Sequence, residues 1–355
     1  MRRVWFIFLV VCLSSGLFAA VNGPGTTGAN YLKIGLGAKA AALGESYTAA
    51  ADDTSSIYWN TAGLSAVRNP RVDFMQLNWL AGISAKTIFG ALPLSEKDTF
   101  GAYVMMLDTP KDKETVYGGN TKSEYLETGK SFNSAISVLN LGYSRIISRA
   151  LDAGIGLKII SEDLAGEKAD GLALDAGLIY KDLIPNLKLG LNVQNIGLKA
   201  LRPEEELPLT IALGAEYSTV FLWNKLSLLL DAKLPNDNDP RFGVGAEYWL
   251  GQYFAGRVGY NTFSQMSLGL GVAFANFNAD YAYVPIDELG VTHRISVGYT
   301  FGLAKQAANP RQELQADLET KENTDAVRKP LKVRKVKAKA NTKASTDDML
   351  TKFDF

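Results

Sequence analysis

The chain has 355 residues, 33 glycines, and 37 basic against 37 acidic residues. This length and composition suit one large β domain with tails. A net charge near zero gives no sequence-wide positive field to hold phosphates, so nucleic acid is excluded as the expected partner.

The first 20 residues have the features of a secretory signal peptide. Arg2 and Arg3 precede a short apolar run at residues 4–13, and small residues follow up to Ala19 and Ala20, where we predict cleavage. The apolar run is shorter than the roughly 20 residues that a membrane-spanning helix needs. The sequence therefore predicts an exported protein without an N-terminal anchor.

Residues 21–67 differ from the rest of the chain in composition and in residue pattern. Glycine and alanine are frequent, and the segment lacks sustained strand alternation. A segment of small residues and turn formers can fold inside a barrel, where its backbone polar groups meet lumen-facing groups instead of lipid. We therefore expect residues 21–67 to form a lumen plug, or hatch.

Residues 71–302 alternate between apolar and polar side chains with a period of two, which indicates strands with one apolar face. In residues 187–193, for example, every second residue is Leu or Val. Segments of this kind number about fourteen, each of roughly 9 to 11 residues, the length that crosses an outer membrane at a tilt. The fold class predicted is all-β, a 14-stranded antiparallel transmembrane β-barrel with an N-terminal lumen plug. A soluble secreted β-sandwich is the alternative.

The connections between these strands alternate in length, as they do in outer-membrane barrels. With residues 71–79 as the first outward strand, short turns fall on the periplasmic side, and residues 218–224 form one longer inner connection. The short turns are at residues 95–98, 148–150, 251–252 and 275–276. The long outer loops are at residues 109–132, 163–170, 197–207 and 285–291.

Three segments of the chain resemble the FadL-like outer-membrane barrels and, within them, the PorV/PorQ group. They are residues 34–44 (IGLGAKAAALG), 50–53 (AADD) and 57–64 (IYWNTAGL). The resemblance covers about residues 30–302 and implies a fourteen-stranded barrel with a hatch in its lumen. Thr61 stands where the family's hatch motif has a proline, which would fix φ.

The resemblance also implies two functions. In the FadL branch the barrel moves long-chain fatty acids or other hydrophobic molecules inward. In the PorV branch it serves the type IX secretion system and receives the C-terminal domains of exported proteins, beside a translocon.

The hatch residues that we single out are Asp52, Asp53, Tyr58, Trp59, Asn60, Thr61, Ala62 and Gly63. For Tyr58 and Trp59 we favour packing of the plug over direct ligand contact. Asp52 and Asp53 either pair with Lys or Arg in the lumen or serve as an Asx turn or helix cap, and we favour the latter.

Side chains for catalysis and metal binding are scarce. Cys12 lies within the signal peptide, and His293 is the only histidine. One histidine excludes multi-His metal sites and leaves a single possible Ser–His arrangement. Residues 236–239 (NDND) offer oxygen ligands for Ca²⁺, although a solvated hairpin turn is the favoured interpretation. We predict no catalytic residues, no metal and no cofactor.

The barrel ends with a closing-strand pattern at residues 296–303, and residues 303–355 follow as a basic tail. We expect the tail to be disordered and periplasmic. It is either a solvated segment or a tether to an acidic partner or the cell wall.

The leading hypothesis for function is a non-enzymatic, PorV-like component of protein export to the cell surface, located in the outer membrane among its lipids. The polar outer loops favour it slightly. The alternatives are a FadL-like importer of hydrophobic small molecules, with the plug as gate, and a structural barrel tethered by its tail.

Overall fold

The computed structural model describes residues 23–302, except residues 119–124, 182, 204 and 287–288. The predicted signal peptide and the predicted basic tail lie outside these described residues. In the part of the chain that is described, no helix has the length and apolar character to cross a membrane.

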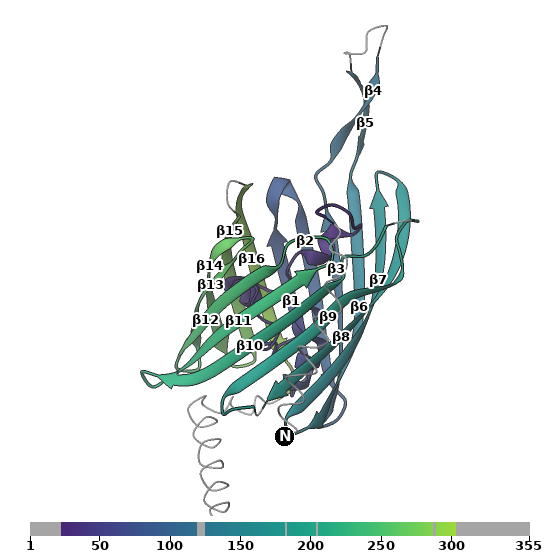
Figure 1. The fold of residues 1–355 in the computed structure, drawn as a ribbon. Coiled ribbons are helices and arrows are strands. Elements are labelled where there is room, and N and C mark those ends of the chain that lie inside the picture. The colour runs from purple at the N-terminus through teal and green to yellow at the C-terminus, as the bar shows by residue number, and fades with distance from the viewer. Residues whose placement is uncertain (1–22, 119–124, 182, 204, 287–288, 303–355) are drawn as a thin grey trace, which may run out of the picture. The chain divides into compact units, whose positions relative to one another are not determined.

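Fourteen strands form a closed barrel in which every neighbouring pair is antiparallel (Figure 1). The seam closes where the first strand pairs with the last, with Arg71 opposite Thr300. The predicted fold class and strand count are confirmed. The barrel strands are β1 (Arg71–Asn78), β2 (Ser84–Pro93), β3 (Asp98–Asp108), β6 (Ser134–Ser148), β7 (Leu151–Leu164), β8 (Glu167–Lys181), β9 (Leu187–Lys199), β10 (Thr210–Phe221), β11 (Asn224–Pro235), β12 (Arg241–Leu250), β13 (Phe254–Asn261), β14 (Gln265–Phe274), β15 (Phe277–Ile286) and β16 (Gly290–Thr300).

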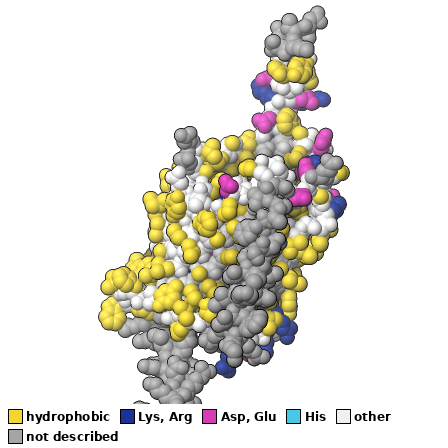
Figure 2. Space-filling view, viewed as in Figure 1, with side chains coloured by type: hydrophobic (Ala, Val, Ile, Leu, Met, Phe, Trp, Pro, Cys, Tyr) yellow, Lys and Arg dark blue, Asp and Glu magenta, His cyan; other side chains and the backbone are white. Residues whose placement is uncertain are grey.

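The strands present apolar side chains outward and polar side chains inward. In β16, buried Arg294 and Ser296 alternate with exposed Ile295 and Val297. Figure 2 shows apolar side chains spread over the visible outer face of the barrel, with charged side chains gathered on the projecting ribbon and near the barrel ends. This distribution is the reverse of that in a water-soluble barrel and is characteristic of a transmembrane barrel.

The four predicted short turns all connect strands at one end of the barrel. Three other predicted connections were wrong. Residues 218–224 form a tight hairpin, because pairing continues to Phe221–Asn224 and both Leu222 and Trp223 take positive φ (45° and 69°). Residues 163–170 are likewise a hairpin paired to Leu164–Glu167, not a long loop. Residues 285–291 are not a long outer loop either, because the pairing of β15 with β16 continues to Ile286–Gly290. In all three places the strands are longer than the sequence pattern suggested.

The predicted loop at residues 109–132 contains a two-stranded ribbon, β4 (Asp112–Tyr117) and β5 (Tyr125–Phe132). It projects beyond the barrel at the end opposite the short turns (Figure 1). The same end carries the short helix η3 (Leu80–Gly82) between β1 and β2, and the long connection from β9 to β10.

The plug comprises the described residues that precede β1. It contains four short helices, η1 (Asn30–Lys33), α2 (Ala38–Ala42), α3 (Ser56–Trp59) and η2 (Thr61–Ala66). Most of its side chains are buried, and it packs against the inner face of the barrel wall. The wall gives room for it through inward-facing glycines: a Cβ atom on Gly259 would lie 1.9 Å from the backbone nitrogen of Gly44.

Candidate functional site: the plug and its outer recess

The predicted hatch motif lies against the inner face of β6, β7 and β8. Asn60 is fully buried, and its Oδ1 accepts a hydrogen bond from the Ala62 amide at the start of η2, so it is the N-cap of that helix. Its Nδ2 donates to the carbonyl of Thr48 in the plug (2.8 Å) and to that of Leu178 in β8 (3.1 Å). One amide therefore caps a helix and fixes the plug to the wall.

Close backbone approach explains the small residues of the motif. A Cβ atom on Gly63 would lie 2.4 Å from the Ala51 carbonyl oxygen, and one on Gly154 in β7 would lie 2.4 Å from the Ala62 nitrogen. The Ala62 carbonyl accepts a hydrogen bond from Ser144 Oγ in β6 at 2.9 Å. Thr61 is the first residue of η2, a position that favours proline, which accounts for the proline of the family's motif.

Tyr58 and Trp59 are packed inside the plug. Their rings meet edge to face with centroids 4.9 Å apart. The Tyr58 hydroxyl donates to the Leu32 carbonyl (3.0 Å), and Trp59 Nε1 donates to the Leu36 carbonyl (2.6 Å). Both hydrogen bonds tie the motif to the strand-free segment before α2, as expected for residues used in packing.

Asp52 and Asp53 have different uses, although they are adjacent. Asp52 Oδ1 lies 2.7 Å from Lys39 Nζ and accepts a hydrogen bond from the Tyr47 hydroxyl. Asp53 Oδ1 accepts from both the amide and the hydroxyl of Ser55, an Asx-type turn that leads into α3. The favoured Asx turn therefore describes Asp53, whereas Asp52 pairs with a lysine of the plug itself.

The two carboxyls also differ in pKa. Burial acts to raise the pKa of Asp52, but the Lys39 ammonium outweighs it and holds that pKa below its ordinary value. For Asp53, burial and the neighbouring charge of Asp52 prevail over Lys39, so its pKa is raised. Mutual repulsion across an adjacent pair separates the two pKa values in this way.

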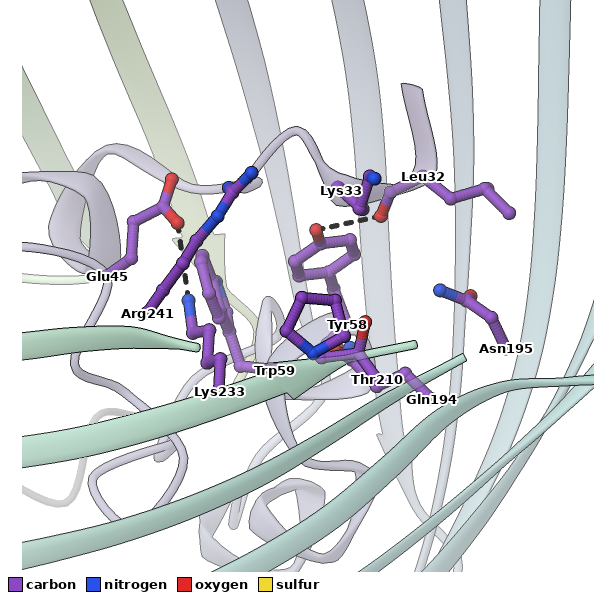
Figure 3. Close-up of a pocket in the computed structure, with 11 residues that line it drawn as sticks. Leu32, Lys33, Glu45, Tyr58, Trp59, Gln194, Asn195, Thr210, Lys233 and Arg241 are labelled. Carbon is purple, nitrogen blue, oxygen red and sulfur yellow. Dashed lines mark hydrogen bonds and ion pairs between the residues drawn. The ribbon is translucent and has the colours of Figure 1, made fainter. Parts of the chain in front are cut away.

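A small recess lies beside Tyr58 and Trp59, where the plug faces the outer ends of β9–β12 (Figure 3). Its cavity volume is about 30 Å³. Such a space holds about one water molecule and no hydrocarbon. The residues that line it are Leu32, Lys33, Glu45, Tyr58, Trp59, Gln194, Asn195, Thr210, Lys233, Pro235 and Arg241.

Charged side chains close this recess. Lys233 Nζ lies 3.2 Å from Glu45 Oε2 and 4.3 Å from the centroid of the Trp59 ring, so it bridges the wall to the plug. Burial acts to raise the pKa of Glu45, but the positive charges of Lys233, Arg294 and Arg241 together hold it below its ordinary value. The plug carboxylate is thus held in its ionised form.

The turn at residues 236–239 is part of the same arrangement and is not a solvated hairpin turn. Asp237 is fully buried; its Oδ2 accepts a hydrogen bond from Thr27 Oγ1 and lies 2.7 Å from Lys33 Nζ. The preceding segment, residues 205–209, is bridged to the plug through Thr27 and Glu206. The beginning of the plug is therefore fastened at the outer end of the barrel.

The barrel wall is interrupted beside the recess. The ladder between β9 and β10 stops at Gln194–Thr210, so the last residues of β9 pair with β8 alone. Asn195 takes a positive φ of 60° where the β8–β9 register shifts, and its Nδ2 donates to the Pro208 carbonyl at 3.0 Å. A cavity of about 500 Å³ lies over this interruption; its lining includes the apolar Ile196, Leu198, Leu207 and Leu209 and the polar Glu205, Glu206 and Asn236. Asn195 lines both this cavity and the recess.

The recess residues outside the motif were not predicted. A signal was present: Asp231 and Lys233 occupy alternate positions of β11, and charges at inward positions of a membrane strand need partners in the lumen. The partner Glu45 lies in the alanine-rich part of the plug, where nothing in the sequence pointed to it.

His293 lies on the outer face of β16, where its Nδ1 is 2.8 Å from the Tyr281 hydroxyl. Among the described residues, no group of three or more His, Cys, Asp or Glu side chains is arranged to hold a metal ion.

No family model matches the chain. A UPF0164 protein of Treponema pallidum (strain Nichols) is 23% identical over 306 residues, which cover 80% of this chain and 71% of that protein. The predicted PorV/PorQ branch of the resemblance stays a prediction.

Solved structures with a similar fold include a monoaromatic hydrocarbon channel. The TodX deltaS2S3 mutant monoaromatic hydrocarbon channel has a TM-score of 0.52 and 13% identity, covering 75% of this chain and 99% of that one. The Pseudomonas putida toluene transporter TodX has a TM-score of 0.49 at 14% identity, covering 74% and 96% of the two chains. The first of these likenesses shows that the chain shares the fold of that barrel, and in this chain the barrel has fourteen strands.

Proposed function

We propose that this protein is an outer-membrane channel for small hydrophobic molecules and that the plug closes it. The apolar outer face of the barrel supports a membrane location, and the signal-peptide pattern supports export. The fold is that of a hydrocarbon channel. The proposal requires passage only, with no covalent chemistry.

Loop lengths orient the barrel in this proposal. The short turns lie in the periplasm and the ribbon projects outside, so the recess above Trp59 faces the external medium. A molecule from outside would meet the recess, which Tyr58 and Trp59 line, before it met Asn60 and the rest of the hatch motif.

The observation that carries the proposal is the meeting of the recess with the interrupted wall at Asn195. On the lumen side of Asn195 lie the rings of Tyr58 and Trp59, and on the outer side lie Ile196 and Leu198. The Asn195–Pro208 hydrogen bond joins the two edges beyond the point where the β9–β10 ladder stops. Movement of residues 205–209 would open an apolar route from the recess to the hydrocarbon layer, which a hydrophobic molecule favours over water.

A reversible disulfide tests this route. A Cβ atom on Gly197 would lie 3.9 Å from Leu207 Cβ, which is a suitable separation for a disulfide. In Gly197→Cys/Leu207→Cys, oxidation would fix the segment over the interruption. We expect uptake of radiolabelled toluene or oleate into cells that lack other such channels to fall on oxidation and to return on reduction.

A matched control places the disulfide in the ribbon. A Cβ atom on Gly118 would lie 3.3 Å from Leu126 Cβ, so Gly118→Cys/Leu126→Cys joins two strands outside the barrel. Its uptake should not depend on oxidation. Equal uptake by the oxidised and reduced forms of the Gly197–Leu207 variant would exclude this route, and equal uptake by cells with and without the protein would exclude the function.

A PorV-like role in protein export is the second candidate, and the ribbon is the observation that favours it. Val116, Tyr117, Tyr125 and Leu126 are all exposed on β4 and β5, beyond the barrel. Exposed aromatic side chains are common at protein interfaces. Co-purification of an exported protein's C-terminal domain, lost in Tyr117→Ser/Tyr125→Ser, would support export over import. The tethered-barrel alternative rests on the tail, outside the described residues.

A further inference from the structure

A second apolar hollow lies on the outer surface of the barrel, away from the recess. It has a volume of about 450 Å³, within the range of pockets that hold small molecules, and its lining is almost entirely apolar. The residues that form it come from β6, β7, β8 and β9, and their side chains point outward.

Two adjacent rows of side chains across these strands explain the hollow. One row is Tyr143, Ile155, Ala176 and Val193, and the next row toward the short turns is Arg145, Ala153, Leu178 and Leu191. Each row has one alanine, and the two alanines are diagonal neighbours on β7 and β8. The two small alanine side chains leave a depression in the outer surface, and the larger side chains of both rows surround it.

The wall beneath the hollow is a single backbone layer against the plug. Gly154 and Gly177 lie between the two rows and face inward, and a Cβ atom on Gly177 would lie 2.1 Å from Asn60 Oδ1. The plug prevents the wall from moving inward. The hollow is therefore a fixed feature of a rigid part of the barrel.

Charge is present at one end only. Arg145 points outward near the short-turn end of β6, its side chain is 53% exposed, and it pairs with Asp98 through one nitrogen at 3.0 Å. The remaining guanidinium donors are available for a planar anion such as phosphate, which arginine binds through two parallel hydrogen bonds. The Tyr143 hydroxyl donates to the same aspartate, which fixes this end of the site.

We infer that this hollow is a binding site for one glycerophospholipid of the periplasmic leaflet. An acyl chain occupies the space beside Ala153 and Ala176, and the phosphate lies at Arg145. The order of the two parts matches a lipid of that leaflet, whose phosphate lies toward the short turns and whose chain extends toward the membrane centre. The inference needs the barrel to be in a bilayer but does not need it to transport anything.

Native mass spectrometry of the full-length protein tests the inference, with palmitoyl-oleoyl-phosphatidylglycerol titrated into delipidated samples. The wild type should retain one lipid more tightly than the rest. Ala176→Leu fills the hollow from outside and should weaken retention of that lipid at least tenfold. Arg145→Gln should weaken it severalfold, because the phosphate loses its charged partner.

Matched controls separate this site from ordinary lipid contact. Ala279→Leu adds the same side chain on the outer face of β15, and Arg149→Gln removes a charge from the neighbouring turn. Both should retain the lipid as the wild type does. If Ala176→Leu does not fold by heat-dependent gel shift, Ala153→Leu fills the same space. Equal retention by the wild type and all folded variants would show unspecific lipid contact only and overturn the inference.

Discussion

The plug meets the barrel wall in two different ways. Against β6, β7 and β8 the contact is direct: the Ala62 backbone lies on Gly154, and Asn60 bonds to the Leu178 carbonyl. Against β11 the contact near the recess is made by long charged side chains, chiefly Lys233 with Glu45.

These two contacts should respond differently to change. A backbone that lies on glycine tolerates almost no displacement, since protein interiors are close-packed. A lysine and a glutamate can separate and be rehydrated, at a cost set by partial burial. The plug is therefore fixed where its backbone lies on glycines of the wall, which include Gly190, Gly243 and Gly259 as well as Gly154, and it is adjustable at the recess, which adjoins the interrupted wall.

The largest expected effect comes from Gly154→Val, which places side-chain atoms where Ala62 lies. We expect the free energy that holds the plug against the wall to fall by about 3 kcal/mol, the upper range for overpacking. Single-channel recordings in planar bilayers should show a large rise in lumen conductance. Gly90→Val is the matched control, because a Cβ atom on Gly90 meets nothing within 4 Å. Equal conductance in the two variants would show that the close contact does not hold the plug.

The next effect separates the two uses of Asn60. Asn60→Ala removes both the helix cap and the bonds to Thr48 and Leu178, and should cost about 2 kcal/mol as a buried polar loss. Asn60→Asp keeps an acceptor for the Ala62 amide but loses the donor. Hydrogen exchange of residues 56–66 should report faster opening in both. If residues 56–66 of Asn60→Asp exchange at the wild-type rate, the hydrogen bonds that Asn60 Nδ2 donates contribute nothing to the stability of the plug.

A smaller effect belongs to the recess contact between Lys233 and Glu45 and depends on pH. The pKa of Glu45 in the folded protein lies below the ordinary 4.5. Its contribution to plug seating is therefore complete above about pH 4.5 and declines as the pH falls through the lowered pKa. Lumen conductance should therefore rise in the wild type as the pH falls below about 4.5 and through the lowered pKa of Glu45.

Glu45→Gln is the comparison for this pH dependence. Asp53, whose pKa is raised, acts with the opposite sign, but it is present in both proteins and cancels. The variant should have a smaller rise in conductance on acidification. An identical rise would assign the pH dependence to other carboxyls.

The smallest effect is Thr61→Pro, which introduces at the first position of η2 the proline of the FadL-like motif that this sequence resembles. We expect stabilisation of about 0.5 kcal/mol, because proline restricts the unfolded chain. The thermal midpoint of plug opening, followed by hydrogen exchange, should rise slightly. Thr61→Ala controls for the loss of the side chain; a lower midpoint in Thr61→Pro than in Thr61→Ala would mean that the ring does not fit against Gly142.

The barrel was predictable because its alternation is local. Inward Arg294 and outward Ile295 differ in a way that composition alone reveals, and fourteen such segments make a closed sheet. The hairpin at Leu222 and Trp223 was not predictable, since neither residue is typical of a turn with positive φ. There the continued pairing of the two strands determines the backbone, not the preference of the turn residues.

The site was predictable only where it resembled a family motif. Asn60 and Gly63 belong to a contiguous segment, whereas Lys233 and Glu45 are 188 residues apart and meet through the closure of the barrel. Asp237 was interpreted as a solvated turn residue, because the sequence does not show that Thr27 returns to cover it. Contacts of this range depend on topology, which local pattern does not contain.

The seam between β1 and β16 bears on the order in which the molecule is assembled. The plug precedes every strand in the chain, and its amides reach both sides of the seam: the Gly37 amide lies 2.9 Å from Met75 Sδ in β1, and the Ala38 amide donates to Ser296 Oγ in β16. A curved sheet of thirteen completed ladders could form around the plug before the fourteenth joins its edges. In that sequence of events the sheet would curve around a plug that is already in place. The wall glycines would then lie where the plug backbone touches the sheet.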